Sequence, residues 1–435
     1  MLYFEINSKD MVKVAKLCKK VIDKKAVLPI LSSLKVDVMP VKVSFSCTNL
    51  DQALIISTEC QTQGEGSFLL PFKTIENLNP EGKVIVKYEN SIEIKKDTGS
   101  VILKADNVED FPVIPRDEVK YDLSEDFINK LEGCLPAVSE DETRYVLNGI
   151  CIQKDSIVAT DGRRLHLYKA DNPEIFSLFD KSGIILPSKT AKLLHAIAKS
   201  EKNVKIRTGM EGKIVAKERG RIHPMQPELN RPKIEKPAQV TFQVGNILLV
   251  SKLIDGKFPN WRQVITDEAK ITVEIDKDLL LSTLEDSLNS ADSKNPVVMM
   301  HFDTETDKLE IYTDNSLRNN SEFCSSLSFV NGNSAAPFGM AVNPEFVNDA
   351  LDVIDEERVK LMFAEPLKPV ILQSQENDKA LFVIMPVRVN EPVVSYAEFC
   401  EQKKQKEEKK TEEQCNSEES INQEDEAAEP VAVGD

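Results

Sequence analysis

Residues 3–17 read "YFEINSKDMVKVAKL", and their pattern changes halfway along the stretch. The first residues send alternate side chains to opposite faces, as a β-strand does. After Ser8, a residue suited to a helix N-cap, the apolar residues Met11, Val14 and Ala15 recur at helical spacing. The stretch therefore predicts a strand that runs directly into an amphipathic helix.

The same pattern occurs twice more, as "VKYDLSEDFINKLEG" at residues 119–133 and "ITVEIDKDLLLSTLE" at residues 271–285. Aligned on Asp10, Asp126 and Asp278, the copies lie 116 and 152 residues apart (126 − 10 and 278 − 126). Recurrence at a regular spacing is the signature of a repeated structural module.

A second landmark keeps nearly the same spacing. It reads "LLPFKTIENL" at 69–78, "ILPSKTAKLL" at 185–194 and "MAVNPEFVNDAL" at 340–351, which places Pro71, Pro187 and Val342 at separations of 116 and 155 residues. Each copy again predicts a strand and then a helix, followed by an alternating strand. We infer three copies of one α+β module of about 115 residues.

We place the domains at residues 1–118, 119–270 and 271–392. The middle copy is longer by 36 residues (152 − 116), and the excess falls after Pro187 because the 155-residue spacing already contains it. A proline-rich insertion at about residues 215–240 accounts for this length, since four prolines stop regular structure there: Pro224, Pro227, Pro232 and Pro237. We expect a long surface loop, and a dedicated partner-binding loop is the alternative.

The net charge of −17 is unevenly distributed. Residues 390–435 carry 14 acidic and 5 basic side chains, a net charge of −9, which leaves −8 for the rest of the chain. The end of the chain is rich in Glu, Lys and Gln and cannot bury enough apolar surface to fold alone. We therefore predict that residues 393–435 form an acidic, low-complexity, disordered tail.

Overall composition indicates a soluble globular protein, with 41% hydrophobic and 29% charged residues in a chain of 435. No apolar run reaches the roughly 18–20 residues that a membrane span needs, and the first residues do not resemble an export signal. The eight cysteines include no CxxC pair, and the four histidines are scattered. We expect reduced thiols, no metal site and a cytoplasmic protein without membrane contact.

The stretch "VATDGRRLHLYKA" at residues 158–170 sets an Asp-Gly turn signal beside two arginines. A phosphate-binding loop, part of an active site and a plain hairpin are the three interpretations. Thr48 and Thr313 align with Thr160 at separations of 112 and 153 residues, so a polar turn between strands recurs in each module. This recurrence favours the hairpin, in which Gly162 supplies a positive φ.

Motifs of known catalytic chemistry are missing from the sequence. It contains no GxxxxGK[ST], GxGxxG, GxSxG or HExxH pattern, and no Asp/Glu pair in an apolar setting. We therefore expect no enzymatic activity, no catalytic residue and no cofactor.

Lysines gather in two predicted helices. Residues 9–25 contain Lys9, Lys13, Lys16, Lys19, Lys20, Lys24 and Lys25, and the second helix of the middle module adds Lys189, Lys192, Lys199 and Lys202. Such a face would contact nucleic-acid phosphates without reading bases, because no stacking platform accompanies it. An ordinary solvated helix face is the alternative.

Five short motifs in this order resemble the bacterial DNA polymerase III beta sliding clamp family. They are "LPILSSLKV" (28–36), "RYVLNGI" (144–150), "VATDGRRL" (158–165), "LIDGKFPNW" (253–261) and "FVIMPVRV" (382–389). The likeness runs from residue 1 to about residue 389, where chains of this family usually end.

The resemblance implies three clamp domains per chain and a head-to-tail homodimer, which forms a ring of six domains around duplex DNA. Helices would line the hole and antiparallel sheets would form the outside. The implied function is to tether the replicative DNA polymerase and so confer processivity. The implied partners are sequence-independent duplex DNA, that polymerase, the clamp-loader ATPase, and repair polymerases and other proteins with clamp-binding motifs. The protein would be nucleoid-associated in the cytoplasm.

Two sets of site residues follow from the resemblance. Lys25, Tyr145 and Lys189 correspond to residues that contact DNA. A peptide pocket between the second and third domains, for motifs like Gln-Leu-x-x-Leu-Phe, corresponds to Leu147, Thr160, Gly162, Arg163, Arg164, Leu165, Pro259, Val264, Val383, Ile384, Met385, Pro386, Val387 and Arg388.

The chain also departs from the family pattern. Arg163 stands where histidine is common, and Gln263 stands where a basic residue is common. Acidic residues at 138–143 fall near a loop that usually faces DNA. Asn289 and Ser290 replace an apolar pair that often supports the subunit junction.

Two other functions stay open on the sequence alone. One is a clamp-like scaffold that serves mainly repair partners, and the other is a hydrolase whose site the motifs do not reveal.

Overall fold

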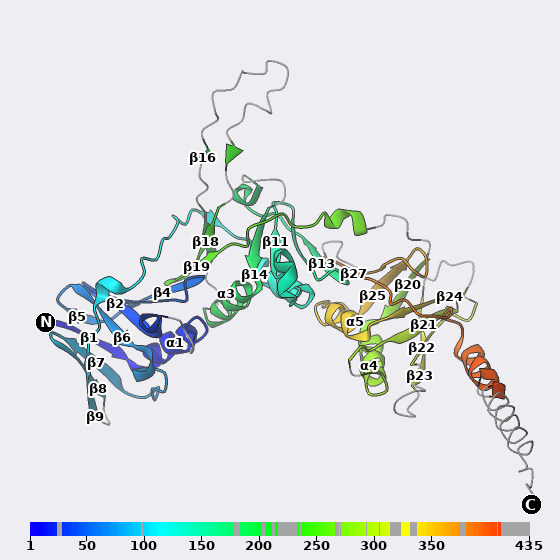
Figure 1. Ribbon diagram of the computed structural model, residues 1–435, viewed down its shortest axis with the longest axis horizontal. Coiled ribbons are helices and arrows are strands. Elements are labelled where there is room, and N and C mark those ends of the chain that lie inside the picture. The colour runs from blue at the N-terminus through cyan, green and yellow to red at the C-terminus, as the bar shows by residue number, and fades with distance from the viewer. Residues whose placement is uncertain are drawn as a thin grey trace, which may run out of the picture. The chain divides into compact units, whose positions relative to one another are not determined.

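The computed structural model describes residues 1–23, 28–96, 99–177, 183–201, 205–210, 214–215, 233–234, 237–265, 269, 271–292, 294–303, 305–313, 323–330, 337–374, 380–406 and 408–409. The chain forms two compact units, Met1–Asn260 and Trp261–Asp435 (Figure 1).

The stretch at residues 3–17 forms the predicted strand and helix. Strand β1 (Leu2–Asn7) runs directly into helix α1 (Ser8–Cys18). The side chain of Asn7 accepts a hydrogen bond from the Lys9 N–H at 3.0 Å, so Asn7 rather than Ser8 caps the helix. The first sheet has the strand order β5 (Gln61–Gln63), β1, β7 (Lys83–Tyr88), β8 (Ser91–Lys96) and β9 (Gly99–Lys104).

The prediction of a helix after Pro71 is wrong. Strand β6 (Gly66–Pro71) is followed only by a single 3-10 turn, Phe72–Thr74. Pro80 disfavours helical geometry at the residue before it, and the intervening "ENLN" contains two asparagines, which are weak helix formers. The segment therefore makes one 3-10 turn and does not continue as an α-helix.

A second sheet joins the first two modules. Residue pairs such as Leu54 and Leu249 bring the two modules together in an antiparallel ladder. The sheet has the order β10 (Tyr121–Asp122), β15 (Ile206–Gly209), β18 (Gln239–Val244), β19 (Ile247–Lys252), β4 (Gln52–Glu59), β3 (Lys42–Thr48), β2 (Ser33–Met39) and β6. Strand β4 belongs to the first module and β19 to the second.

The second module repeats the strand and helix pattern twice, as predicted. Helix α2 (Phe127–Cys134) follows β10, and helix α3 (Ser188–Ser200) follows β14 (Ile184–Pro187). Strands β14, β11 (Gly149–Ile152), β12 (Ser156–Thr160) and β13 (Arg164–Lys169) pair antiparallel in that order.

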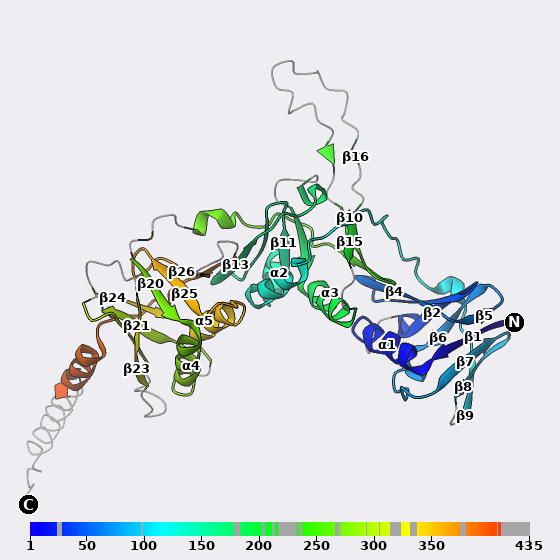
Figure 2. The same cartoon turned by 180° about the vertical axis from the view of Figure 1, so that it is seen from behind.

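Within the first unit the helices gather on one side of the sheets. Figures 1 and 2 both show α1 beside α3 and α3 beside α2. The shared core between helices and sheets contains the fully buried rings of Phe4, Phe45, Phe127 and Phe242. Burying one such side chain contributes about 1.5–3 kcal/mol, so these rings are a main source of stability.

A buried polar network also crosses the boundary between the first two modules. The Gln52 side-chain amide in β4 donates to the Thr190 hydroxyl in α3 at 2.7 Å. The Thr190 hydroxyl in turn lies 2.6 Å from the Ser251 hydroxyl in β19. All three side chains are buried, and the Ser251 hydroxyl also donates to the Lys252 carbonyl at 2.9 Å, so the Thr190 hydroxyl completes a buried chain of hydrogen bonds.

The second unit contains the third module. Strand β20 (Ile271–Asp276) leads into helix α4 (Lys277–Leu288), which Asp276 caps through the Leu279 N–H at 2.9 Å. One sheet has the order β23 (Cys324–Ser328), β22 (Lys308–Tyr312), β21 (Val298–Asp303), β24 (Phe338–Val342). Helix α5 (Pro344–Leu351) follows β24, and strands β20, β25 (Arg358–Phe363), β26 (Val370–Ser374) and β27 (Ala380–Ile384) pair in that order.

Most of the expected proline-rich insertion lies outside the described residues. At its edges, strand β16 (Ile214–Val215) pairs antiparallel with β17 (Lys233–Ile234). No helix among the described residues is both long enough and apolar enough to cross a membrane.

The prediction of disorder from residue 393 onward is wrong for the first part of that range. Residues 396–406 are helical, and the rings of Tyr396 and Phe399 contact Tyr312 of β22. Composition alone missed this helix because two aromatic side chains are enough to hold a polar helix in place when another part of the chain offers a surface for them. Residues 407 and 410–435 lie outside the described residues.

The buried network predicts that the first unit loses stability when the Thr190 hydroxyl is removed. Thr190→Val keeps the shape of the side chain but removes the hydroxyl that accepts from the Gln52 amide, while the Ser251 hydroxyl keeps only its bond to the Lys252 carbonyl. We expect the free energy of unfolding of the first unit to fall by about 2 kcal/mol, measured by urea unfolding. Lys192→Ala, at an exposed position of the same helix, should change it by less than about 0.5 kcal/mol. Equal stability of the two variants would contradict a structural role for the network.

Candidate functional site

Asp161 organises the turn between β12 and β13. Its carboxylate Oδ1 accepts hydrogen bonds from the Arg163 N–H at 2.8 Å and the Arg164 N–H at 2.9 Å. The Thr160 hydroxyl accepts from the Gly162 N–H at 3.1 Å and donates to the Arg164 carbonyl at 2.6 Å. Short-range bonds of this kind fix the path of the turn.

These bonds decide between the phosphate loop and the hairpin. A phosphate-binding loop presents free backbone N–H groups, but those of Gly162, Arg163 and Arg164 are already bonded within the turn. Gly162 has φ +88°, a conformation that favours glycine. The pairing of Thr160 with Leu165 confirms the predicted hairpin.

Arg144 connects this turn to the neighbouring 3-10 segment, Glu142–Leu147. Its guanidinium donates from Nη1 to the Asp161 carbonyl at 2.9 Å and from Nε to the Asp141 carboxylate at 2.9 Å. Hydrogen bonds from Thr143 and from Arg144 lower the pKa of Asp141. Asp141, one of the acids in the sequence at 138–143, is therefore held within the fold.

Sequence reasoning missed Arg144. The available signal was its position at the start of the motif "RYVLNGI", directly before Tyr145. The motif identifies the segment, but only the folded chain shows that the Arg144 side chain reaches back to Asp161.

Within the first unit, the predicted pocket residues differ in their exposure. Leu147 and Leu165 are buried, and they serve as apolar core beneath the turn. Gly162, Arg163 and Pro259 are exposed, whereas Thr160 and Arg164 are half-buried. The guanidinium of Arg164 contacts the Asp161 carboxylate at 3.2 Å and is thereby held close to the turn.

Within the second unit, the remaining pocket residues occupy the end of β27 and the chain after it. Val383 and Ile384 are buried members of the sheet. Met385 follows the end of the strand with its side chain 37% exposed, and Val264 lies exposed elsewhere in the unit. The Val387 N–H donates to the Ala341 carbonyl of β24 at 2.8 Å, and Arg388 is exposed.

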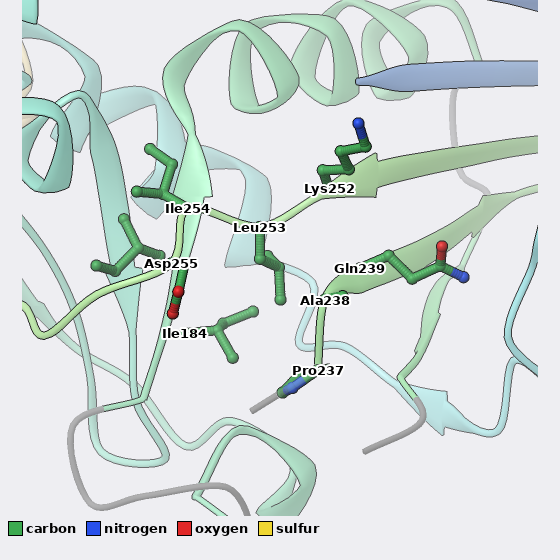
Figure 3. Close-up of a pocket in the computed structure, with 9 residues that line it drawn as sticks. Ile184, Pro237, Ala238, Gln239, Lys252, Leu253, Ile254 and Asp255 are labelled. Atoms are coloured by element: carbon green, nitrogen blue, oxygen red, sulfur yellow. The ribbon is translucent and has the colours of Figure 1, made fainter. Parts of the chain in front are cut away.

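A cavity of about 680 Å³ lies in the first unit between β14 and the ends of β18 and β19. Figure 3 shows Ile184 and Leu253 pointing toward each other across it, whereas Lys252 points away. None of the residues predicted for the pocket lines this cavity. Its walls adjoin residues outside the described ranges at Pro237, and we assign it no role.

Of the three residues expected to contact DNA, the structure describes Tyr145 and Lys189. Tyr145 is 57% exposed, and Lys189 is exposed at the start of α3. Lys25, together with Lys24 and Lys202, lies outside the described residues.

The positive helix face is weaker than the sequence suggests. Lys13 of α1 forms an ion pair with Glu201 at the end of α3, and Lys19 contacts Glu76 at 3.1 Å. Both acids come from distant parts of the sequence, so counting charges within each helix missed them. Lys16 of α1 and Lys192 and Lys199 of α3 are exposed, as is Lys20 just after α1.

Three family models match the chain one after another. They describe the N-terminal, central and C-terminal domains of the DNA polymerase III beta subunit and match residues 2–115, 123–260 and 262–388.

Individual relatives agree with these matches. A beta sliding clamp of Rickettsia felis is 26% identical over 408 residues, which cover 89% of this chain and 100% of that protein. The crystal structure of a DNA polymerase sliding clamp from Pseudomonas aeruginosa with ligand has a TM-score of 0.75 at 19% identity, covering 89% of this chain and all of that one. The sliding clamp from Bartonella birtlesii bound to griselimycin has the same TM-score, identity and coverage.

The Asp161 turn yields a local prediction. Asp161→Ala removes the acceptor of two backbone N–H groups, so hydrogen exchange at Arg163 and Arg164 should become faster. The free energy of unfolding should fall by about 1–2 kcal/mol, the usual cost of losing such a capping side chain. Asp171→Ala, at an exposed carboxylate of the same module, is the matched control. Unchanged exchange rates would show that Asp161 does not hold the turn.

Proposed function

The chain belongs to the DNA polymerase III beta subunit family, and from this premise we propose which of its surfaces hold DNA and which hold partner proteins. Its function is that of a DNA sliding clamp that tethers a DNA polymerase, and members of the family are non-enzymatic processivity factors. The observation that carries this conclusion is the succession of three clamp domains, matched in order from residue 2 to residue 388. Neither a repair-specific scaffold nor a hydrolase gains support from the comparisons.

For the DNA-contacting surface we propose the helix side of the modules. Lys189 and the exposed lysines of α1 and α3 would touch phosphates, and Tyr145 would lie beside them. Contacts with phosphates alone carry no sequence information, which suits a ring that slides. Lys25 belongs to the same proposal on the resemblance alone.

For partner proteins we propose, on the family resemblance, a peptide site that includes residues of the Asp161 turn and residues that follow β27. The Asp161 turn, with Gly162 and Arg163 exposed, would supply the first set of residues together with Pro259. Met385, Pro386, Val387 and Arg388 would supply the second set, together with Val264. Pliable Met385 and the rigid turn suit aliphatic and aromatic anchors of a short peptide.

The proposed partners are those of a replication clamp. They comprise duplex DNA, the replicative polymerase, the clamp-loader ATPase, repair polymerases that carry clamp-binding motifs, and a second copy of the chain. The dimer would close a ring, so that retention on DNA is topological rather than a matter of affinity.

Topology gives the sharpest test of the ring. After loading by the clamp loader, the protein should remain on nicked circular DNA through gel filtration and be lost once a restriction enzyme linearises that DNA at unchanged salt. Sedimentation of the free protein should give a dimer. Equal retention on circular and linear DNA would defeat the ring.

Charge reversal tests the DNA surface. Lys189→Glu should weaken binding to a linear duplex at low salt and lower the slope of log affinity against log salt by about one, because one phosphate contact is lost. Lys42→Glu, an equally exposed lysine on β3, is the control and should behave like the unaltered protein. Identical salt slopes for both variants would remove Lys189 from the contact surface.

A further inference from the structure

Residues 393–406, which follow the family match, pack against a sheet of the second unit. The C-terminal family model ends at residue 388, and residues 393–406, here named the latch, contact strands β22 and β24 of the sheet that also contains β21. The Tyr312 hydroxyl donates to the Val394 carbonyl at 2.7 Å. The Tyr396 N–H donates to the Glu310 carboxylate at 3.0 Å. Both sheet residues lie on β22, so one strand holds the latch at two points.

Three aromatic rings form the centre of this contact. The ring of Tyr312 lies 5.0 Å from that of Phe399 and 5.5 Å from that of Tyr396, between ring centroids. Tyr396 and Phe399 stack on each other at 6.3 Å. Tyr312 is only 1% exposed, so the latch contributes to burying a large ring of the sheet. Rings at these separations attract one another beyond the effect of burial alone.

Gly339 shows that the sheet itself is shaped for the latch. A Cβ atom at this position of β24 would lie 2.1 Å from the Val393 carbonyl oxygen, which is closer than any real contact. Only glycine therefore lets the latch backbone approach the sheet. This residue is far from the latch in sequence and within the part of the chain that the family model matches.

The latch follows directly after residues 385–389, here named the pocket segment. On its N-terminal side the segment is fixed by β27, which ends at Ile384, and by the bond from the Val387 N–H to the Ala341 carbonyl. On its C-terminal side the chain enters the latch at Val393. A cavity of about 370 Å³ is lined by Arg388 and Val389 on one side and by Phe399 and Gln402 on the other. The backbone of residues 390–392 thus connects the pocket segment to the latch, and Lys406 of the latch forms an ion pair with Glu391 on this connection.

We propose that the latch is a positioning device that holds the pocket segment in the conformation that receives a partner peptide, an inference that rests on the proposed peptide site. Met385 and Val389 are each 37% exposed, and the segment has no regular structure of its own. A segment anchored at one end would have to be ordered when peptide binds. When the segment is anchored at both ends, it loses its conformational entropy during folding and not during peptide binding. The affinity for the peptide is therefore higher.

An insertion between the pocket segment and the latch tests the backbone connection without disturbing the contacts of the latch with the sheet. Placing Gly-Ser-Gly-Ser between Asn390 and Glu391 of the full chain leaves the latch and its contacts intact but frees the pocket segment. With a fluorescent peptide Gln-Leu-Ser-Asp-Leu-Phe as probe, we expect the Kd to rise about three- to tenfold while the thermal unfolding midpoint stays unchanged.

Point variants complete the experiment. Gly339→Ala and Phe399→Ala should detach the latch, which raises the Kd by the same factor and also lowers the unfolding midpoint. Phe399→Tyr keeps the ring and should restore the affinity. Glu398→Ala, on the exposed face of the latch helix, is the matched control and should change neither quantity.

The outcomes distinguish this inference from the proposed function. If the unaltered protein does not bind the probe, the peptide site itself is wrong. If it binds and the insertion variant binds equally well, the latch has no positioning role and the peptide site stands. If affinity falls only in variants whose unfolding midpoint also falls, the latch is merely structural and the inference is overturned.

Discussion

The antiparallel pairing of β4 with β19 is the interaction on which the first unit depends. Each module ends its sheet in an edge strand, and an unpaired edge exposes a row of backbone N–H and C=O groups. Pairing Leu54 with Leu249 and their neighbours satisfies both edges at once and turns two modules into one continuous sheet. The helices α1 and α3 then come close enough for Lys13 to reach Glu201. The buried hydroxyl of Thr190 in α3 forms hydrogen bonds with both modules at the same junction.

A carboxylate plays a comparable role on a smaller scale in the turn after β12. Asp161 satisfies two backbone N–H groups that would otherwise be free to bind an anion, and it also contacts the Arg164 guanidinium. The turn is thereby rigid without a ligand. The sequence predicts a polar turn at this position in all three modules, and the third copy lies outside the described residues. In the second module Arg144 adds a bond from the neighbouring segment to the Asp161 carbonyl.

The latch shows why composition misleads at the end of the chain. Residues 390–435 are strongly acidic, and a rule based on charge and hydropathy predicts disorder from residue 393. Tyr396 and Phe399 are two aromatic residues in a polar stretch, but their rings contact Tyr312, the Tyr396 N–H donates to Glu310, and the Val393 backbone lies against Gly339. These partners lie more than fifty residues away in sequence, and the fold alone brings them together.

The sequence by itself determined the repeated strand-to-helix pattern, the three-module α+β fold and the family, because alternation and helical spacing are local and recur in order. It also identified the Asp161-Gly162 hairpin. Tertiary structure alone decided that Lys13 and Lys19 are paired with acids, and that Val383, Ile384 and Leu165 belong to the core rather than to an open surface. Exposure and ion pairing depend on residues remote in the chain, and no local pattern contains that information.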